Sequence, residues 1–105
     1  MITYTVRTDR SETGAATTND DALGEALTTV LMLHAHHAAA EPATAMGPCT
    51  VRVGDSEPIL IRAAPPSGDD ERDHANLAAH LTQLYRDVSG DPLAMLPTVE
   101  PPAPA

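Results

Sequence analysis

A group of histidines in the first half of the chain has the spacing of a metal site. His34 and His37 are three residues apart, so on an α-helix they share a face and both could reach a zinc or nickel ion. His74 and His80 would add ligands if their segment lay alongside. However, no carboxylate or cysteine stands at a recognised spacing such as H-E-x-x-H, and the helix dipole favours histidine near a helix C-terminus. We therefore expect no metal and no cofactor, with His34 and His37 as weak candidates.

The single cysteine is the other residue that could do covalent chemistry. Cys49 has no second cysteine to pair with, so nothing indicates an oxidising compartment. It begins an alternating segment in which Cys49, Val51 and Val53 share one side, whereas activated cysteines lie at helix N-termini or beside cations. We expect a buried apolar residue here and assign no catalytic residue.

Charge is the strongest chemical feature of the sequence. Fifteen Asp and Glu stand against six basic residues, which are all arginine, and the formal net charge is −9. This charge opposes nucleic-acid binding, because phosphate contacts depend on Lys and Arg, and no Phe or Trp is present to stack on bases. The absence of lysine also removes Schiff-base chemistry and a P-loop lysine.

The acidic residues gather where helices and turns are expected, and capping and solvation alone would account for that position. The sharper hypothesis is recognition of a basic protein surface by electrostatic complementarity. A DNA mimic would need the carboxylates on one continuous face, and the sequence does not say whether the two helix starts share an end of the molecule. The expected contact residues are Asp20, Asp21, Glu25, Asp69, Asp70, Glu71 and Asp73.

Five segments have the periodicity of regular structure. Residues 2–8 alternate as a half-buried strand, and residues 19–40 have helical spacing with a cap at Thr18 or Asn19. Residues 49–53 and 59–63 predict a hairpin. Residues 69–89 predict a second helix with a core stripe, capped by Ser67 or Asp69 and ended by a glycine and a proline. The stripe consists of Leu77, Leu81, Leu84, Tyr85 and Val88.

This order predicts a two-layer α+β fold, with a small antiparallel sheet and two helices on one face. Residues 15–18 are too weak a strand signal for a prediction. A short last strand at 93–96 stays open and would complete the ferredoxin-like order. The expected domain covers residues 1–96, and the four prolines from Pro97 onward predict a disordered tail over 97–105.

These patterns bear on three classes of function. An enzyme is disfavoured, since no phosphate loop or nucleophile–base arrangement is visible. We expect a small non-enzymatic protein that binds a basic partner protein, of inhibitor, immunity, antitoxin or accessory type. The alternatives are a self-associating structural protein such as a homodimer, a DNA-mimic inhibitor, and a histidine-based metal binder. With no signal peptide and no apolar run of membrane length, we expect a cytoplasmic location.

Overall fold

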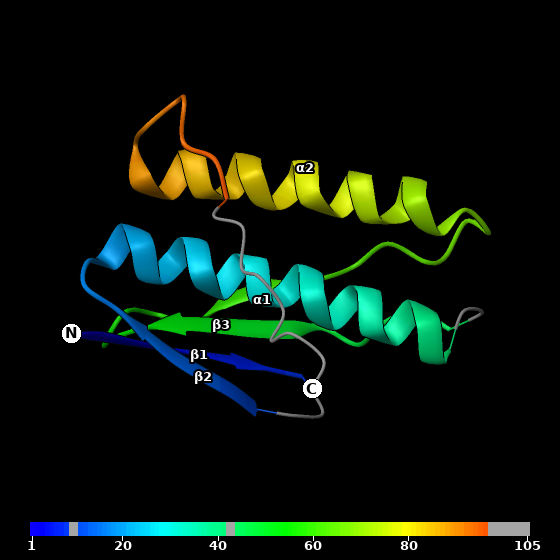
Figure 1. The fold of residues 1–105 in the computed structure, drawn as a ribbon, viewed down its shortest axis with the longest axis horizontal. Coiled ribbons are helices and arrows are strands. Elements are labelled where there is room, and N and C mark those ends of the chain that lie inside the picture. The colour runs from blue at the N-terminus through cyan, green and yellow to red at the C-terminus, as the bar shows by residue number, and fades with distance from the viewer. Residues whose placement is uncertain (9–10, 42–43, 97–105) are drawn as a thin grey trace, which may run out of the picture.

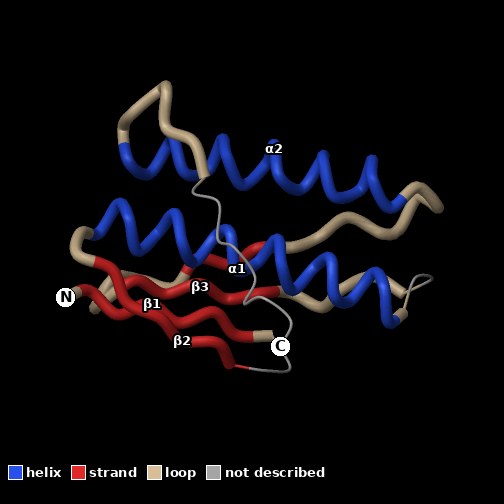
Figure 2. The backbone as a smooth tube through the Cα atoms, in the orientation of Figure 1, coloured by secondary structure: helices blue, strands red, loops and turns tan. Residues whose placement is uncertain are grey.

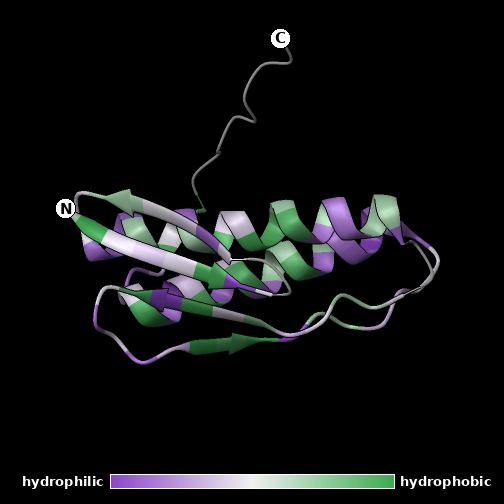
Figure 3. Cartoon of the chain, turned by 90° about the horizontal axis from the view of Figure 1, so that it is seen from below, coloured by the Kyte–Doolittle hydropathy of each residue, from purple (hydrophilic) through white to green (hydrophobic). Residues whose placement is uncertain are grey.

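The chain forms a four-stranded antiparallel sheet with two helices on one of its faces (Figures 1 and 2). The computed structural model describes residues 1–8, 11–41 and 44–96. In Figure 3, which looks from below, the strands lie in front of both helices. The predicted α+β class, with both helices on one face, is confirmed. The elements are β1 (Ile2–Arg7), β2 (Ser11–Ala16), α1 (Asn19–Ala40), β3 (Cys49–Val53), β4 (Ile59–Ile61) and α2 (Asp70–Ser89).

The sheet has the strand order β2-β1-β3-β4, and every neighbouring pair is antiparallel. Val6 lies opposite Val51, and Cys49 lies opposite Ile61, so these apolar residues share the face that the helices cover. All four are buried. The predicted inward alternation of β1, β3 and β4 is therefore confirmed, including the exposed exception at Leu60.

The second strand was missed by the sequence prediction. Residues 11–16 pair along the whole of β1, from Arg7 opposite Ser11 to Ile2 opposite Ala16. Gly14 and the alanines of this segment have low strand propensity, but a hairpin needs little intrinsic preference in its second strand when the first is strong and adjacent. The weak signal at 15–18 was also misplaced, because Thr18 already caps α1.

The optional last strand, and with it the ferredoxin-like order, is wrong for the described part of the chain. Residues 93–96 form no strand. Instead the chain turns after α2, where the Asp91 side chain accepts a hydrogen bond from the Leu93 amide at 2.9 Å. The Arg86 side chain then donates to the Ala94 carbonyl at 2.9 Å. Backbone groups that a sheet would have used are thus occupied by side chains. The element order is β-β-α-β-β-α.

Helix α1 begins at the predicted cap and is buried mainly in its first half. The Thr18 hydroxyl accepts from the Asp21 amide at 3.1 Å. Leu23, Leu27 and Val30 are buried against the sheet, whereas every residue from position 31 to the end of the helix is half-buried or exposed. The 22-residue helix is about 33 Å long, but a six-residue strand spans only about 20 Å. Its C-terminal part therefore extends past the sheet.

Helix α2 runs antiparallel to α1 and packs along it (Figure 1). Asp69 is its cap, accepting from the Arg72 amide at 3.1 Å, and Gly90 ends it in the left-handed conformation at φ 75°. Leu77, Leu81 and Tyr85 of the predicted stripe are buried in the core. Leu84 is only half-buried, and Val88 is 55% exposed. The stripe prediction is therefore wrong at Val88, which lies in the last turn of α2 and is exposed to solvent.

Replacing Leu81 by alanine should lower the free energy of unfolding by about 2–5 kcal/mol, because the side chain is fully buried and leaves a cavity. Chemical denaturation followed by circular dichroism measures this. Leu93→Ala is the matched control, since Leu93 is 83% exposed, and it should change stability by less than about 0.5 kcal/mol. Equal effects of the two substitutions would contradict the assigned core.

Candidate functional site

The two main groups of predicted contact acids lie at opposite ends of the molecule. Asp20 and Asp21 stand in the first turn of α1, and Asp70, Glu71 and Asp73 stand in the first turn of α2. Because the helices are antiparallel, their starting ends face away from each other (Figure 1). The acids therefore form two separate groups and no continuous row. Glu25 of the predicted set lies farther along α1 and is half-buried.

Two of the acids at the start of α2 accept hydrogen bonds that stabilise this end of the helix. Asp69 caps the helix, and the Asp73 carboxylate accepts from both the Ser67 hydroxyl at 2.7 Å and the Ser67 amide at 3.0 Å. These hydrogen bonds to the charged form lower the pKa of Asp73. Asp70 and Glu71 are exposed, and within the described residues neither side chain makes a hydrogen bond or ion pair. Only these last two are available to a partner without disturbing the helix start.

The acids at the start of α1 lie close to the end of α2. Burial raises the pKa of the Tyr85 phenol, and the nearby carboxylates of Asp20, Asp21 and Asp91 raise it further. This cluster of three negative charges shows that the chain folds acids from two distant segments onto one end. The sequence prediction included Asp20 and Asp21 as contact residues, but it did not predict that Asp91 lies near them.

His34 lies at the contact between the two helices. Its ring centroid is 6.1 Å from that of His74, and its Nδ1 atom is buried with no hydrogen-bond partner among the described residues. Burial lowers the pKa of His34, and His74 lowers it further, against a smaller opposing effect of Asp73. His80 lines a neighbouring cleft with His34, Asp73 and Arg62. The two helices are thus neighbours, which is the arrangement that His74 and His80 would need to share a site with His34.

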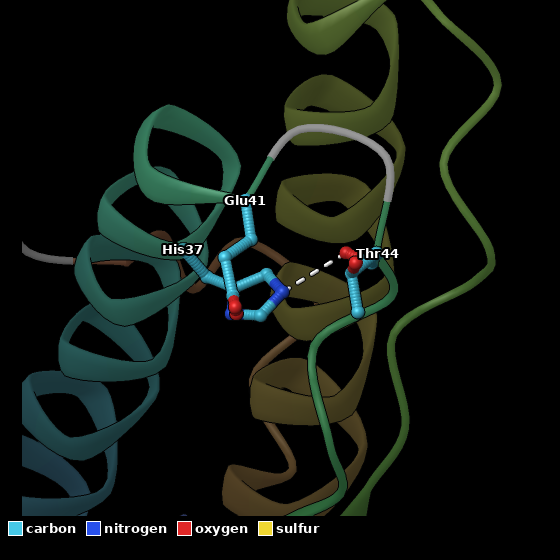
Figure 4. Close-up of polar contacts among 3 residues, drawn as sticks. All are labelled: His37, Glu41 and Thr44. Carbon is cyan, nitrogen blue, oxygen red and sulfur yellow. Dashed lines mark hydrogen bonds and ion pairs between the residues drawn. The ribbon is translucent and has the colours of Figure 1, made fainter.

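The other weak metal candidate points elsewhere. Nε2 of His37 lies 2.9 Å from the Thr44 carbonyl oxygen, and Nδ1 lies 3.7 Å from a carboxylate oxygen of Glu41 (Figure 4). Both ring nitrogens therefore contact the segment that follows α1. In the part of the chain that the structure describes, no three His, Cys, Asp or Glu side chains are arranged to hold a metal ion. His34 faces His74 across the helix contact, and it also lines one small pocket with His37, Asp70 and Asp73.

Cys49 is fully buried in the core, between the sheet and the helices. It pairs across the sheet with Ile61, on the same face as Val51. No solvent reaches the thiol, so a substrate could not reach it without opening the core. The structure thus confirms the burial that the alternating pattern predicts.

A large hollow in the described surface was missed by the sequence prediction. It is a groove of about 650 Å³ between the second half of α1 and the β1–β2 hairpin. It exists because α1 extends past the sheet, a length difference that no local pattern reveals. The one local signal for the groove is Met32, an apolar residue that helical periodicity places on the side of α1 opposite Leu23. The principal lining residues are Tyr4, Glu12, Met32, Leu33, His36, Glu41 and Met46.

Tyr4 forms the inner end of this groove by lying across β2. A Cβ built at Gly14, directly opposite on the neighbouring strand, would overlap the phenol oxygen and Cζ of Tyr4. Only glycine leaves room for the ring at this position. Burial raises the pKa of the Tyr4 phenol, and the Glu25 carboxylate raises it further, while a hydrogen bond with Thr29 lowers it.

Comparison with known proteins gives no relative: no protein-family model, no curated protein and no solved structure matches this chain. Among the described residues, neither helix combines the length and the apolar character needed to cross a membrane.

Gly14→Ala should destabilise the protein by about 1–3 kcal/mol, because the Tyr4 ring must leave its position. The cost should shrink in a Tyr4→Leu background, a coupling that a double-mutant cycle measures. Gly47→Ala is the control, since a Cβ there meets nothing within 4 Å. A Gly14→Ala cost unaffected by Tyr4→Leu would show that the contact between them is unimportant.

Stability should fall as the pH drops below about 6.5, the usual pKa of histidine in an unfolded chain. The lowered pKa of folded His34 means that the unfolded state binds a proton there first. The groups facing His34 are His74, Asp73 and Asp70 from α2, and His37 from its own helix. Urea unfolding across pH 5–8 measures the slope; His34→Leu should flatten it, whereas Leu93→Gln should leave it unchanged.

Proposed function

We propose that this chain is a non-enzymatic protein that binds a basic protein partner through its acidic exterior, as an inhibitor, immunity, antitoxin or accessory protein does. The observation that carries the proposal is the unpaired state of the acids. In the described ranges, the single ion pair joins His37 and Glu41, and no arginine pairs with a carboxylate. The net charge of −9 arises because acidic residues outnumber arginines, and the lack of arginine–carboxylate pairs leaves the described carboxylates available to steer a cationic protein and speed association.

The positions of the reactive side chains favour binding over catalysis. A catalytic centre needs a nucleophile or acid–base group converging with others in a cleft. Here Cys49 is buried in the core, the His37 ring contacts Thr44 and Glu41, and His34 faces His74 at a helix contact. Cys49 lies apart from both histidines, and the pocket that His34 and His37 share with Asp70 and Asp73 has a volume of only about 20 Å³, which is too small for a substrate.

The alternatives receive less support from the geometry. A DNA mimic needs a row of carboxylates, whereas the acids of the two helix starts lie at opposite ends. Self-association through the uncovered sheet face would bring arginines together. On that face Arg7 lies opposite Thr50 and Arg52 lies opposite Thr5, which places the two arginines diagonally on neighbouring strands.

Immobilised protein should capture a basic protein from a lysate of its host, with identification by mass spectrometry. Raising the salt from about 0.05 to about 0.5 M should release that protein, because screening weakens contacts between exposed charges. Asp70→Asn with Glu71→Gln should reduce capture several-fold, since both side chains are exposed and neither supports the helix start.

The matched control is Asp55→Asn with Glu57→Gln, which removes the same charge from the exposed β3–β4 turn. Capture should depend more strongly on the acids of α2 than on those of this turn. A captured partner that is acidic, or whose release ignores salt, would overturn the proposal.

A further inference from the structure

The two edges of the sheet differ in how they are protected. β4 forms one edge and has only three residues, preceded by Pro58 and followed shortly by Pro65 and Pro66. Short strands and prolines are the usual means of blocking edge pairing. β2 forms the other edge over six residues, SETGAA, with no proline and no lysine. Its outer backbone N–H and C=O groups face outward, and the one charged side chain on the strand, the inward Glu12, disfavours an apolar or acidic strand at this edge but not a basic one.

The groove of about 650 Å³ includes part of this edge strand in its lining. Glu12 and Thr13 of β2 line it on one side, and Met32 and His36 of α1 line it on the other. A strand added to β2 would lie about 4.8 Å beyond it, with alternate side chains pointing to the helix-covered face. Those side chains would enter the groove beneath the part of α1 that extends past the sheet.

We propose that an extended segment of the basic partner adds to β2 as a fifth strand and places alternate side chains in this groove. The inference rests on the proposed function and names the binding mode and the chemistry of the ligand. Backbone hydrogen bonds to a sheet edge supply affinity in such complexes, while pockets for alternate side chains supply specificity.

The lining of the groove defines the inward-facing side chains of that segment. Met32, Leu33 and Met46 present flexible apolar surface, which suits aliphatic side chains of varied shape. Glu12 and Glu41 carry the only carboxylates that line the groove among the described residues, and no arginine lines it. Glu41 already contacts His37, so Glu12 is the carboxylate left for a partner. The matching segment therefore alternates aliphatic residues with one inward lysine or arginine.

A second copy of this chain fits the groove poorly. The inward row of β2 is Glu12, Gly14 and Ala16, since these lie opposite inward residues of β1. Pairing of two β2 edges would insert no aliphatic side chain larger than a methyl group, and it would add a carboxylate beside an existing one. A different chain, with larger apolar and basic residues, satisfies the groove.

The probe is a capped peptide of about seven residues in which threonines alternate with valine, lysine and valine. Its sequence reads the same in both directions, so it can pair in a parallel or an antiparallel sense. Titration with a fluorescent label should show saturable binding. Met32→Glu and Glu12→Lys should each weaken it by about tenfold or more. Met95→Glu and Glu57→Lys, the same changes at exposed positions outside the groove, should leave it within about twofold.

N-methylation of the peptide distinguishes strand addition from simple filling of a hollow. Amides of alternate residues point to the same side of a strand, so methylating one alternate set should abolish binding and methylating the other should not. Amide exchange across Ser11–Ala16 should also slow in the complex. Replacing the peptide lysine by glutamate should weaken binding.

Equal tolerance of both N-methylated sets, binding unaffected by Met32→Glu, or no saturation would overturn the inference. So would a dimer in light scattering that Met32→Glu dissociates, because the edge would then serve a second copy. The proposed function is tested separately. If Met32→Glu captures the basic partner as well as the wild type, the function stands and the strand addition fails; if no basic partner is captured, the function fails whatever the peptide does.

Discussion

Packing of aliphatic side chains between the first half of α1 and the inner face of the sheet is the interaction on which the other features of this chain depend. Leu27 and Val30 of the helix, with Val6 and Val51 of the central strands, are fully buried. Full burial of each of these Leu and Val side chains contributes about 1.5–3 kcal/mol. Only a few apolar side chains remain for α2, which packs along α1 through the buried residues Leu77, Leu81 and Tyr85.

The length of α1 determines what happens outside that core. The N-terminal half of the helix packs on the sheet, and the groove separates its later turns from the β1–β2 hairpin. One side of these later turns forms the groove beside β2, and the end is held by the contacts of His37 with Thr44 and Glu41. The other side meets α2, where His34 and His74 face each other. A single difference in element length thus places two distinct chemical environments along one helix.

Local signals in the sequence predicted most of the regular structure because each was strong on its own. The alternation of Ile2, Tyr4 and Val6, the caps at Thr18 and Asp69, and the stop at Gly90 all have direct physical causes and all appear in the structure. β2 escaped prediction since its stability comes from pairing with β1 and not from its own residues. The opposite placement of the acidic groups and the groove depend on how the helices run in space, which no short window of sequence contains.

The contrast between the two edges of the sheet limits how far edge pairing can extend. A chain that forms fibres by adding strands needs a pairing edge at each side, so that every molecule joins two neighbours. Here the proline-flanked, three-residue β4 closes one side and β2 leaves the other open. Any assembly built on strand pairing therefore terminates after a single addition, and the protein can expose an unprotected strand without becoming the seed of a filament.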